Sequence, residues 1–229
     1  MKSLIKVTFV IAVIFASTFI LAKVFGVLSV EQIKIWLEQA HQASDIVLVM
    51  AVIILLFADL FVAIPTLTIC ILAGYFLGFG LGATAALIGV MFAGICGYWM
   101  SRFYGERFLK RLLKQELQRQ ELKASFKQHG FVMILLSRAM PILPEVSACL
   151  AGMTFMPFLR FMLAWILVSL PYVLIAAYSG SISSLNDPKP AIITAVALTA
   201  VFAISWTVFK RKISRAGVVM ATRENHVNK

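Results

Sequence analysis

The chain alternates long apolar stretches with short polar or basic segments. Runs of spanning length lie at Leu4–Ala22, Ala83–Ser101, Phe158–Tyr178 and Ala191–Phe209. An α-helix rises about 1.5 Å per residue, so about 20 apolar residues cross a hydrocarbon core about 30 Å thick. Each of these runs therefore predicts a transmembrane helix.

Two further apolar stretches are interrupted by proline. Ile46–Phe79 is divided at Pro65, and Phe131–Phe155 is divided at Pro141 and Pro144. The piece after each proline turn is too short to cross the bilayer, so we expect each stretch to form a re-entrant hairpin that dips into the membrane and returns.

Composition supports a membrane protein. Hydrophobic residues make up 61% of the 229 residues and charged residues only 14%, against about 45–50% and about 25% in soluble domains. A disordered chain, a secreted disulfide scaffold and an ordinary cytosolic enzyme are disfavoured.

The net charge of +11 is concentrated beside the apolar runs. The segment Arg102–His129 carries eight basic and three acidic residues, and the tail from Lys210 carries six basic residues and one glutamate. This distribution is typical of topology determinants and anionic-lipid contacts, and not of nucleic-acid binding. Recurring leucines and phenylalanines predict one basic amphipathic helix on the membrane surface over Arg102–His129.

Charge also orients the predicted elements. If both basic segments and both termini are cytoplasmic, the two proline-interrupted hairpins have opposite orientations. The expected fold is an all-α polytopic membrane protein, an inverted repeat of two re-entrant helical hairpins, each followed by a transmembrane helix, with further transmembrane helices at both ends. The expected parts are an N-terminal transmembrane helix (1–28), an interfacial helix (29–45), a central membrane domain (46–180), a C-terminal transmembrane helix (181–209) and a basic cytoplasmic tail (210–229).

Three charged residues inside apolar segments are the main candidates for chemistry. Asp59 precedes the Pro65 turn, Arg138 precedes the second turn, and Glu145 follows Pro144. A charge at the bilayer centre costs roughly 2.5–3.5 kcal/mol on insertion scales and is usually functional. We expect Arg138 to bind a lipid phosphate, with Asp59 or Glu145 as its counter-charge or a proton carrier. The alternative is a static Asp59–Arg138 pair, with Glu145 stabilising a helix start.

Other features bear on the site less directly. The helices after the two proline turns would aim free N–H groups at a common point, which favours an anionic headgroup. Arg102 at the end of a span is a weaker candidate, and Arg160 is expected to extend to the surface. Cys70, Cys96 and Cys149 lack metal-ligand spacing, and no Ser–His–Asp arrangement is evident. We therefore expect no metal, no cofactor and no enzymatic activity.

Several short motifs recur around the two proline turns. The second half contains Ser137-Arg138-x-x-Pro141-x-x-Pro144-Glu145, Ala151-Gly152-Met153 and Ser169-Leu170-Pro171-Tyr172. The first half contains Pro65, Ala73-Gly74 and Gly97-Tyr98-x-x-x-Arg102-x-x-Gly105. Over roughly residues 45–180 these motifs resemble those of VTT-domain proteins in the DedA superfamily, close to the SNARE-associated Golgi protein branch. Ile64-Pro65-Thr66 stands where many bacterial members have a Pro-Gly-Glu turn.

The resemblance implies re-entrant loops that face each other and a role in lipid translocation. Bacterial members are associated with undecaprenyl phosphate recycling and eukaryotic members with phospholipid scrambling. The expected function is a flippase- or scramblase-type lipid translocase, multi-pass in a bacterial inner membrane, that moves a lipid phosphate such as undecaprenyl phosphate or a phospholipid. A proton-coupled small-ion antiporter and a non-transporting membrane scaffold are the alternatives. Homo-oligomerisation is left open.

Overall fold

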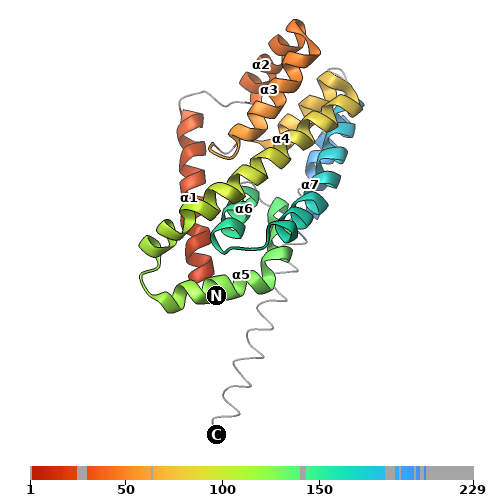
Figure 1. The fold of residues 1–229 in the computed structure, drawn as a ribbon. Helices are drawn as coiled ribbons and strands as arrows, with labels where there is room; N and C mark the ends of the chain where they lie inside the picture. The colour runs from red at the N-terminus through yellow and green to blue at the C-terminus, as the bar shows by residue number, and fades with distance from the viewer. Residues whose placement is uncertain are drawn as a thin grey trace.

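The computed structural model describes residues 2–24, 30–62, 64–139, 143–183, 189–190, 192–198, 200–201 and 204, and its regular elements in these ranges are helices. At the N-terminus are α1 (Lys2–Val24) and α2 (Val30–Ala43). Figure 1 shows α1 beside the rest of the molecule, with α2 at the end opposite the start of α5. The first predicted span falls within α1, and the predicted interfacial helix coincides with α2.

The first proline-interrupted stretch forms two helices separated by a turn. Helix α3 (Asp45–Ala58) begins at Ser44, whose side chain accepts a hydrogen bond from the Val47 N–H. Helix α4 (Thr66–Leu112) begins directly after Pro65. The interruption at this proline agrees with the sequence pattern.

Helix α4 reverses direction at Gly78, where the backbone leaves the helical region with φ 73° and ψ 175°. A Cβ added at Gly82 would overlap the Ala73 carbonyl. In a straight helix these two residues would be roughly 13 Å apart along the axis, so the chain folds back on itself here. Glycine adopts a positive φ without steric cost. The short piece and the long span expected from the sequence are thus two antiparallel arms of α4.

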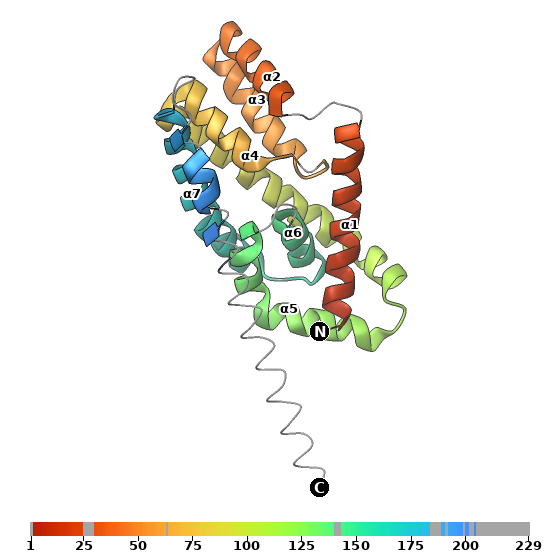
Figure 2. The ribbon, with the colours of Figure 1, turned by 180° about the vertical axis from the view of Figure 1, so that it is seen from behind.

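The second half contains α5 (Glu116–Leu136), a 3-10 turn (Ser137–Ala139), α6 (Leu143–Met153) and α7 (Phe158–Ser181). Helix α7 runs continuously through Pro171. Pro141, part of the predicted C-terminal span and the whole tail from residue 210 lie outside the described residues. Figures 1 and 2 show α6 in the middle of the molecule, where it contacts α1, α4 and α5.

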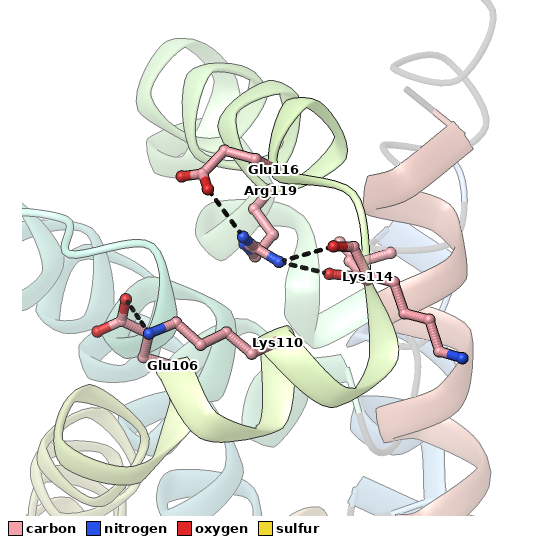
Figure 3. Close-up of polar contacts among 6 residues, drawn as sticks. Glu106, Lys110, Lys114, Glu116 and Arg119 are labelled. Carbon is pink, nitrogen blue, oxygen red and sulfur yellow. Dashed lines mark hydrogen bonds and ion pairs between the residues drawn. The ribbon is translucent and has the colours of Figure 1, made fainter.

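The prediction of one amphipathic helix over Arg102–His129 is wrong, because α4 ends at Leu112 and α5 begins at Glu116. Arg119 stabilises this break (Figure 3). Its guanidinium donates to the carbonyls of Leu113 at 2.8 Å and Lys114 at 3.2 Å, and to the Glu116 carboxylate at 3.1 Å. These carbonyls would accept hydrogen bonds from the following residues if α4 continued, and Arg119 satisfies them instead. The chain therefore turns, and the first part of α5 lies across the end of the molecule (Figure 1).

Close contacts between small residues hold the helices together. A Cβ at Gly74 would overlap the Ala177 carbonyl on α7, and one at Gly152 would overlap the Tyr98 carbonyl on α4. Such close approach of backbones is typical of helix packing in membranes. Helices α4 and α7 are also the two described helices long and apolar enough to cross a membrane. The architecture is consistent with a helical membrane protein.

Candidate functional site

Asp59 lies in the turn between α3 and α4 and is only 6% exposed. Its Oδ1 accepts a hydrogen bond from the Ile64 N–H at 2.7 Å, and its Oδ2 accepts one from the Thr66 hydroxyl at 2.6 Å. The carboxylate therefore closes the proline turn and holds the first residue of α4.

Glu145, which belongs to the second half of the chain, lies close to Asp59 in the structure. It lies in the first turn of α6, and it lines the same small cavity as Asp59. Both carboxyl groups line a cavity of about 20 Å³, together with Leu60, Ala93, Gly94, Ala148 and Trp165. A cavity of this size holds about one water molecule and no lipid headgroup. The structure thus brings the two acidic candidates together around a cavity of the size of one water molecule.

Arg138 lies beside this pair, in the 3-10 turn after α5. Its Nη2 donates to the Ser169 hydroxyl at 3.1 Å. Its guanidinium carbon lies 4.8 Å from the ring centre of Tyr172 and 5.5 Å from that of Trp165. All three partners are on α7, at positions that face one side of a helix.

The structure does not contain the static Asp59–Arg138 pair considered from the sequence. Among the described residues no carboxylate forms an ion pair with Arg138, although its charge acts on both Asp59 and Glu145. The guanidinium rests instead on two aromatic faces, which attract cations. Sequence reasoning missed these contacts, although the motif Ser169-Leu170-Pro171-Tyr172 contained two of the three partners.

Arg102 is not part of this cluster. On α4 it is about two turns beyond Gly94, which lines the cavity. Its Nη1 donates to the Tyr98 hydroxyl and, at 3.5 Å, to the Met156 carbonyl. Its guanidinium also lies over the Phe155 ring. The four candidate residues therefore divide into a deep cluster of Asp59, Arg138 and Glu145, and a separate position for Arg102.

The remaining predicted positions take part in helix packing or lie at the surface. Pro144 is buried in the first turn of α6, and Gly74 and Gly152 make the close helix contacts described above. Arg160 is exposed and donates to the Lys127 carbonyl at 3.3 Å. Within the described ranges no three His, Cys, Asp or Glu side chains are grouped as metal ligands.

Comparison with known proteins agrees with the motifs at the two turns. A family model described as VTT domain matches residues 64–182. Undecaprenyl phosphate transporter A of Bacillus subtilis (strain 168) is 27% identical over 129 residues, which make up 51% of this chain and 64% of the relative. The chain thus spans less than two thirds of that relative's length. No solved structure matches the chain significantly.

Proposed function

Because the chain belongs to the VTT-domain family, we propose that it is a membrane lipid translocase that moves a lipid phosphate across the bilayer. Family membership confirms the resemblance drawn from the sequence, and the similar transporter in Bacillus supports a membrane transport role. The observation that carries the proposal is the environment of Arg138. Its guanidinium is partly buried between the helices, where one hydroxyl and two rings contact it and no carboxylate among the described residues forms an ion pair with it.

The chemistry of this environment suits a phosphate. A guanidinium stays charged and presents planar paired donors that match phosphate oxygens, whereas a lysine supplies charge without that geometry. The N-termini of α4 and α6 begin at the two turns, with Asp59 and Glu145 beside them. Helix N-termini favour negative charge. The lipid phosphate of the Bacillus relative's name, undecaprenyl phosphate, is the substrate class that we infer for this chain.

The two halves form an inverted repeat of re-entrant hairpins in this proposal. The first short arm, after Pro65, places Gly74 against α7, and α6, the second short helix, places Gly152 against α4. Each short helix therefore packs on the long helix of the other half, as a repeat requires. Both also end in a residue with positive φ, Gly78 at 73° and Phe155 at 58°. These reciprocal contacts support facing hairpins with their turns near the midplane.

Transport requires the hairpins to separate. The cavity between Asp59 and Glu145 has room for about one water molecule, so a headgroup reaches Arg138 only when the two turns move apart. The closed structure represents the lipid-free state in this scheme. While the turns are closed, Asp59 and Glu145 line the cavity, and Arg138 contacts Ser169 and two rings of α7.

The same observation favours a second candidate, a proton-coupled small-ion antiporter. Two acidic side chains that line one water-sized cavity are suited to exchange a proton. In that function Arg138 would regulate the acidic pair and would not contact a lipid.

Reconstitution in liposomes tests the proposal. The purified full chain is incorporated with a fluorescent lipid phosphate, and a membrane-impermeant quencher reports the fraction in the outer leaflet. Exchange without a proton gradient indicates a scramblase, and exchange only with a gradient indicates coupled transport. No exchange of any lipid, with intact proton flux, would favour the antiporter; no flux of either kind would favour a scaffold.

Topology is tested separately. We propose that the basic segment near Gln118 and the C-terminal tail both face the cytoplasm of a bacterial inner membrane, as the excess of lysine and arginine predicts. In a variant lacking the native cysteines, Gln118→Cys and Asn225→Cys should react with an impermeant thiol reagent only after the cells are opened. Reaction at either position in intact cells would contradict this orientation.

A further inference from the structure

The turn between α6 and α7 holds a phenylalanine in a left-handed conformation. Phe155 has a φ of 58°, which residues other than glycine seldom adopt. Two hydrogen bonds fix it, from the Phe155 N–H to the Gly152 carbonyl at 3.1 Å and from the Met156 N–H to the Ala151 carbonyl at 3.0 Å. This is the Schellman arrangement that ends many helices, usually with glycine at this position. The phenylalanine side chain is 43% exposed, so burial does not explain its presence.

Two cations from different helices converge on the Phe155 ring. The guanidinium carbon of Arg102, on α4, lies 5.3 Å from the ring centre, and the Nζ of Lys123, on α5, lies 5.0 Å from it. The Tyr98 hydroxyl and the Met156 carbonyl hold Arg102 in place, and the Tyr98 hydroxyl in turn donates to the Met156 carbonyl.

Neither cation is neutralised by a neighbour in the part of the chain that the structure describes. The ion pairs there join Lys34 to Glu38, Lys110 to Glu106, and Arg119 to Glu116. The carboxylate nearest in sequence to Arg102, that of Glu106, is therefore paired with Lys110. Two like charges held beside one ring repel each other, and a bound anion would remove that repulsion.

The position of this cluster along α4 corresponds to a membrane surface. Arg102 lies about 33 Å along the helix from Gly80, which is about the thickness of the hydrocarbon core. The surrounding residues Trp99, Phe103 and Tyr104 are exposed. Exposed aromatic side chains next to cations are typical of the boundary between lipid tails and water. Figure 1 places this end of α4 at the end of the molecule across which α5 lies.

We propose that Arg102, Lys123 and Phe155 form a binding site for the phosphate of a membrane lipid at the membrane surface, separate from the deep cluster around Arg138. The identification of the phosphate as that of a lipid rests on the proposed function. The cavity beside the deep cluster has room for about one water molecule, whereas this site lies among exposed aromatic side chains, so a lipid phosphate meets Arg102 and Lys123 first. The ring keeps the two cations apart and in place, and the anion binds both.

A binding experiment with matched variants tests the site. The purified full chain is titrated with phosphatidic acid in detergent, and the lipid-bound fraction is measured by native mass spectrometry. The double variant Arg102→Gln/Lys123→Gln should bind phosphatidic acid roughly tenfold more weakly, because charge-assisted contacts to the phosphate are lost. The control Lys110→Gln/Lys127→Gln removes the same charge from the same two helices and should bind like the unaltered chain.

Other outcomes would overturn the inference. Equal weakening in both double variants would mean that binding depends on general charge, and undiminished binding in Arg102→Gln/Lys123→Gln would exclude the site. Complete displacement by an equal concentration of inorganic phosphate would assign the site to soluble phosphate. Loss of all phosphatidic acid binding in Arg138→Gln would leave the deep cluster as the binding site. If the double variant does not fold, Lys123→Gln can be measured alone. This substitution removes one cation and its contact with the Phe155 ring, and it should weaken phosphatidic acid binding less than the double substitution.

The binding measurement is independent of transport. If Arg102→Gln/Lys123→Gln loses phosphatidic acid while the unaltered chain moves no lipid in liposomes, the proposed function fails and the surface site remains. If transport occurs and binding is the same in all variants, the surface site fails and the proposed function remains.

Discussion

Each short helix that follows a proline turn ends in one left-handed residue, but the two ends have different surroundings. At Gly78 in the first half, an added Cβ would meet no atom within 4 Å. At Phe155 in the second half, the side chain lies against Arg102 and Lys123. Gly78 is explained by its backbone alone, because glycine adopts a positive φ without steric cost. Phenylalanine in the second half is retained against its conformational preference, and such strain often marks a functional position.

The two proline turns also differ in which residues contact their charged side chains. The first turn is closed by its own residues, since Asp59 accepts hydrogen bonds from Ile64 and Thr66. At the second turn, Arg138 donates a hydrogen bond to a hydroxyl on α7 and contacts two aromatic rings of the same helix. The first half therefore supplies a locally satisfied acid, and the second half supplies a cation whose partners come from another helix. At the two proline turns, this difference leads us to assign lipid binding to Arg138 and turn stability to Asp59.

The largest effect is expected at Arg138. Arg138→Ala should lower lipid transport in liposomes roughly a hundredfold, because the charge-assisted bonds to phosphate are lost. Arg138→Lys should restore part of the activity, since the charge returns without the planar donors. The exposed Arg160→Ala serves as the control and should transport normally.

A double variant separates this expectation from a static ion pair. If Asp59 and Arg138 existed mainly to neutralise each other, Asp59→Asn/Arg138→Ala would recover the yield and the transport lost in the single variants. Because the structure shows separate partners for the two groups, we expect the double variant to remain inactive. Recovery of transport would contradict the assignment of lipid binding to Arg138.

Asp59 should affect stability. Thr66→Val leaves the buried Oδ2 of Asp59 without its hydroxyl donor, which should cost about 1–3 kcal/mol in the free energy of unfolding. Thr66→Ser keeps the donor and is the matched control. Thermal unfolding in detergent measures both variants. A Thr66→Val protein as stable as Thr66→Ser would show that the turn does not depend on this bond.

Substitution of the two left-handed residues should affect stability to different degrees. Gly78→Ala places a Cβ in a strained backbone and should cost about 1–2 kcal/mol, despite the open space around it. Phe155→Gly relieves strain but removes two cation–ring contacts of about 0.5–1 kcal/mol each, so its stability should stay within about 1 kcal/mol of the unaltered chain. Its phosphatidic acid binding should weaken by a few-fold. Unchanged binding in Phe155→Gly would mean that the ring does not position the cations.

Salt gives the smallest expected difference. Raising the salt concentration shortens the range of charge interactions between exposed groups to a few ångströms and affects buried groups much less. Phosphatidic acid binding at Arg102 and Lys123 should therefore weaken with salt. Thermal stability, which depends on the buried bonds of Asp59, should change little. A stability loss as large as the binding loss would contradict the distinction between an exposed and a closed cluster.

Local pattern accounts for the parts of the fold that the sequence predicted well. The breaks at Pro65 and in the Gly-rich segment follow from backbone chemistry, because proline cannot continue a helix from the preceding turn and glycine permits a positive φ. The extent of α1, α2 and α7 follows from runs of apolar or amphipathic residues. The break before Glu116 was missed, since it depends on hydrogen bonds from Arg119 to carbonyls that precede it by several residues.

The sequence by itself determined that this is a helical membrane protein with charged groups at two proline turns, because hydrophobicity, proline and charge act locally and leave a pattern in the chain. Only the tertiary structure decided which charges meet. Asp59 and Glu145 line one cavity. Arg138 contacts Ser169 and two rings of α7. Arg102 and Lys123 both contact the Phe155 ring. These contacts join residues far apart in the chain, and they depend on the close helix packing that Gly74 and Gly152 permit. Contacts of that kind depend on how the helices pack in three dimensions and leave no local pattern in the sequence.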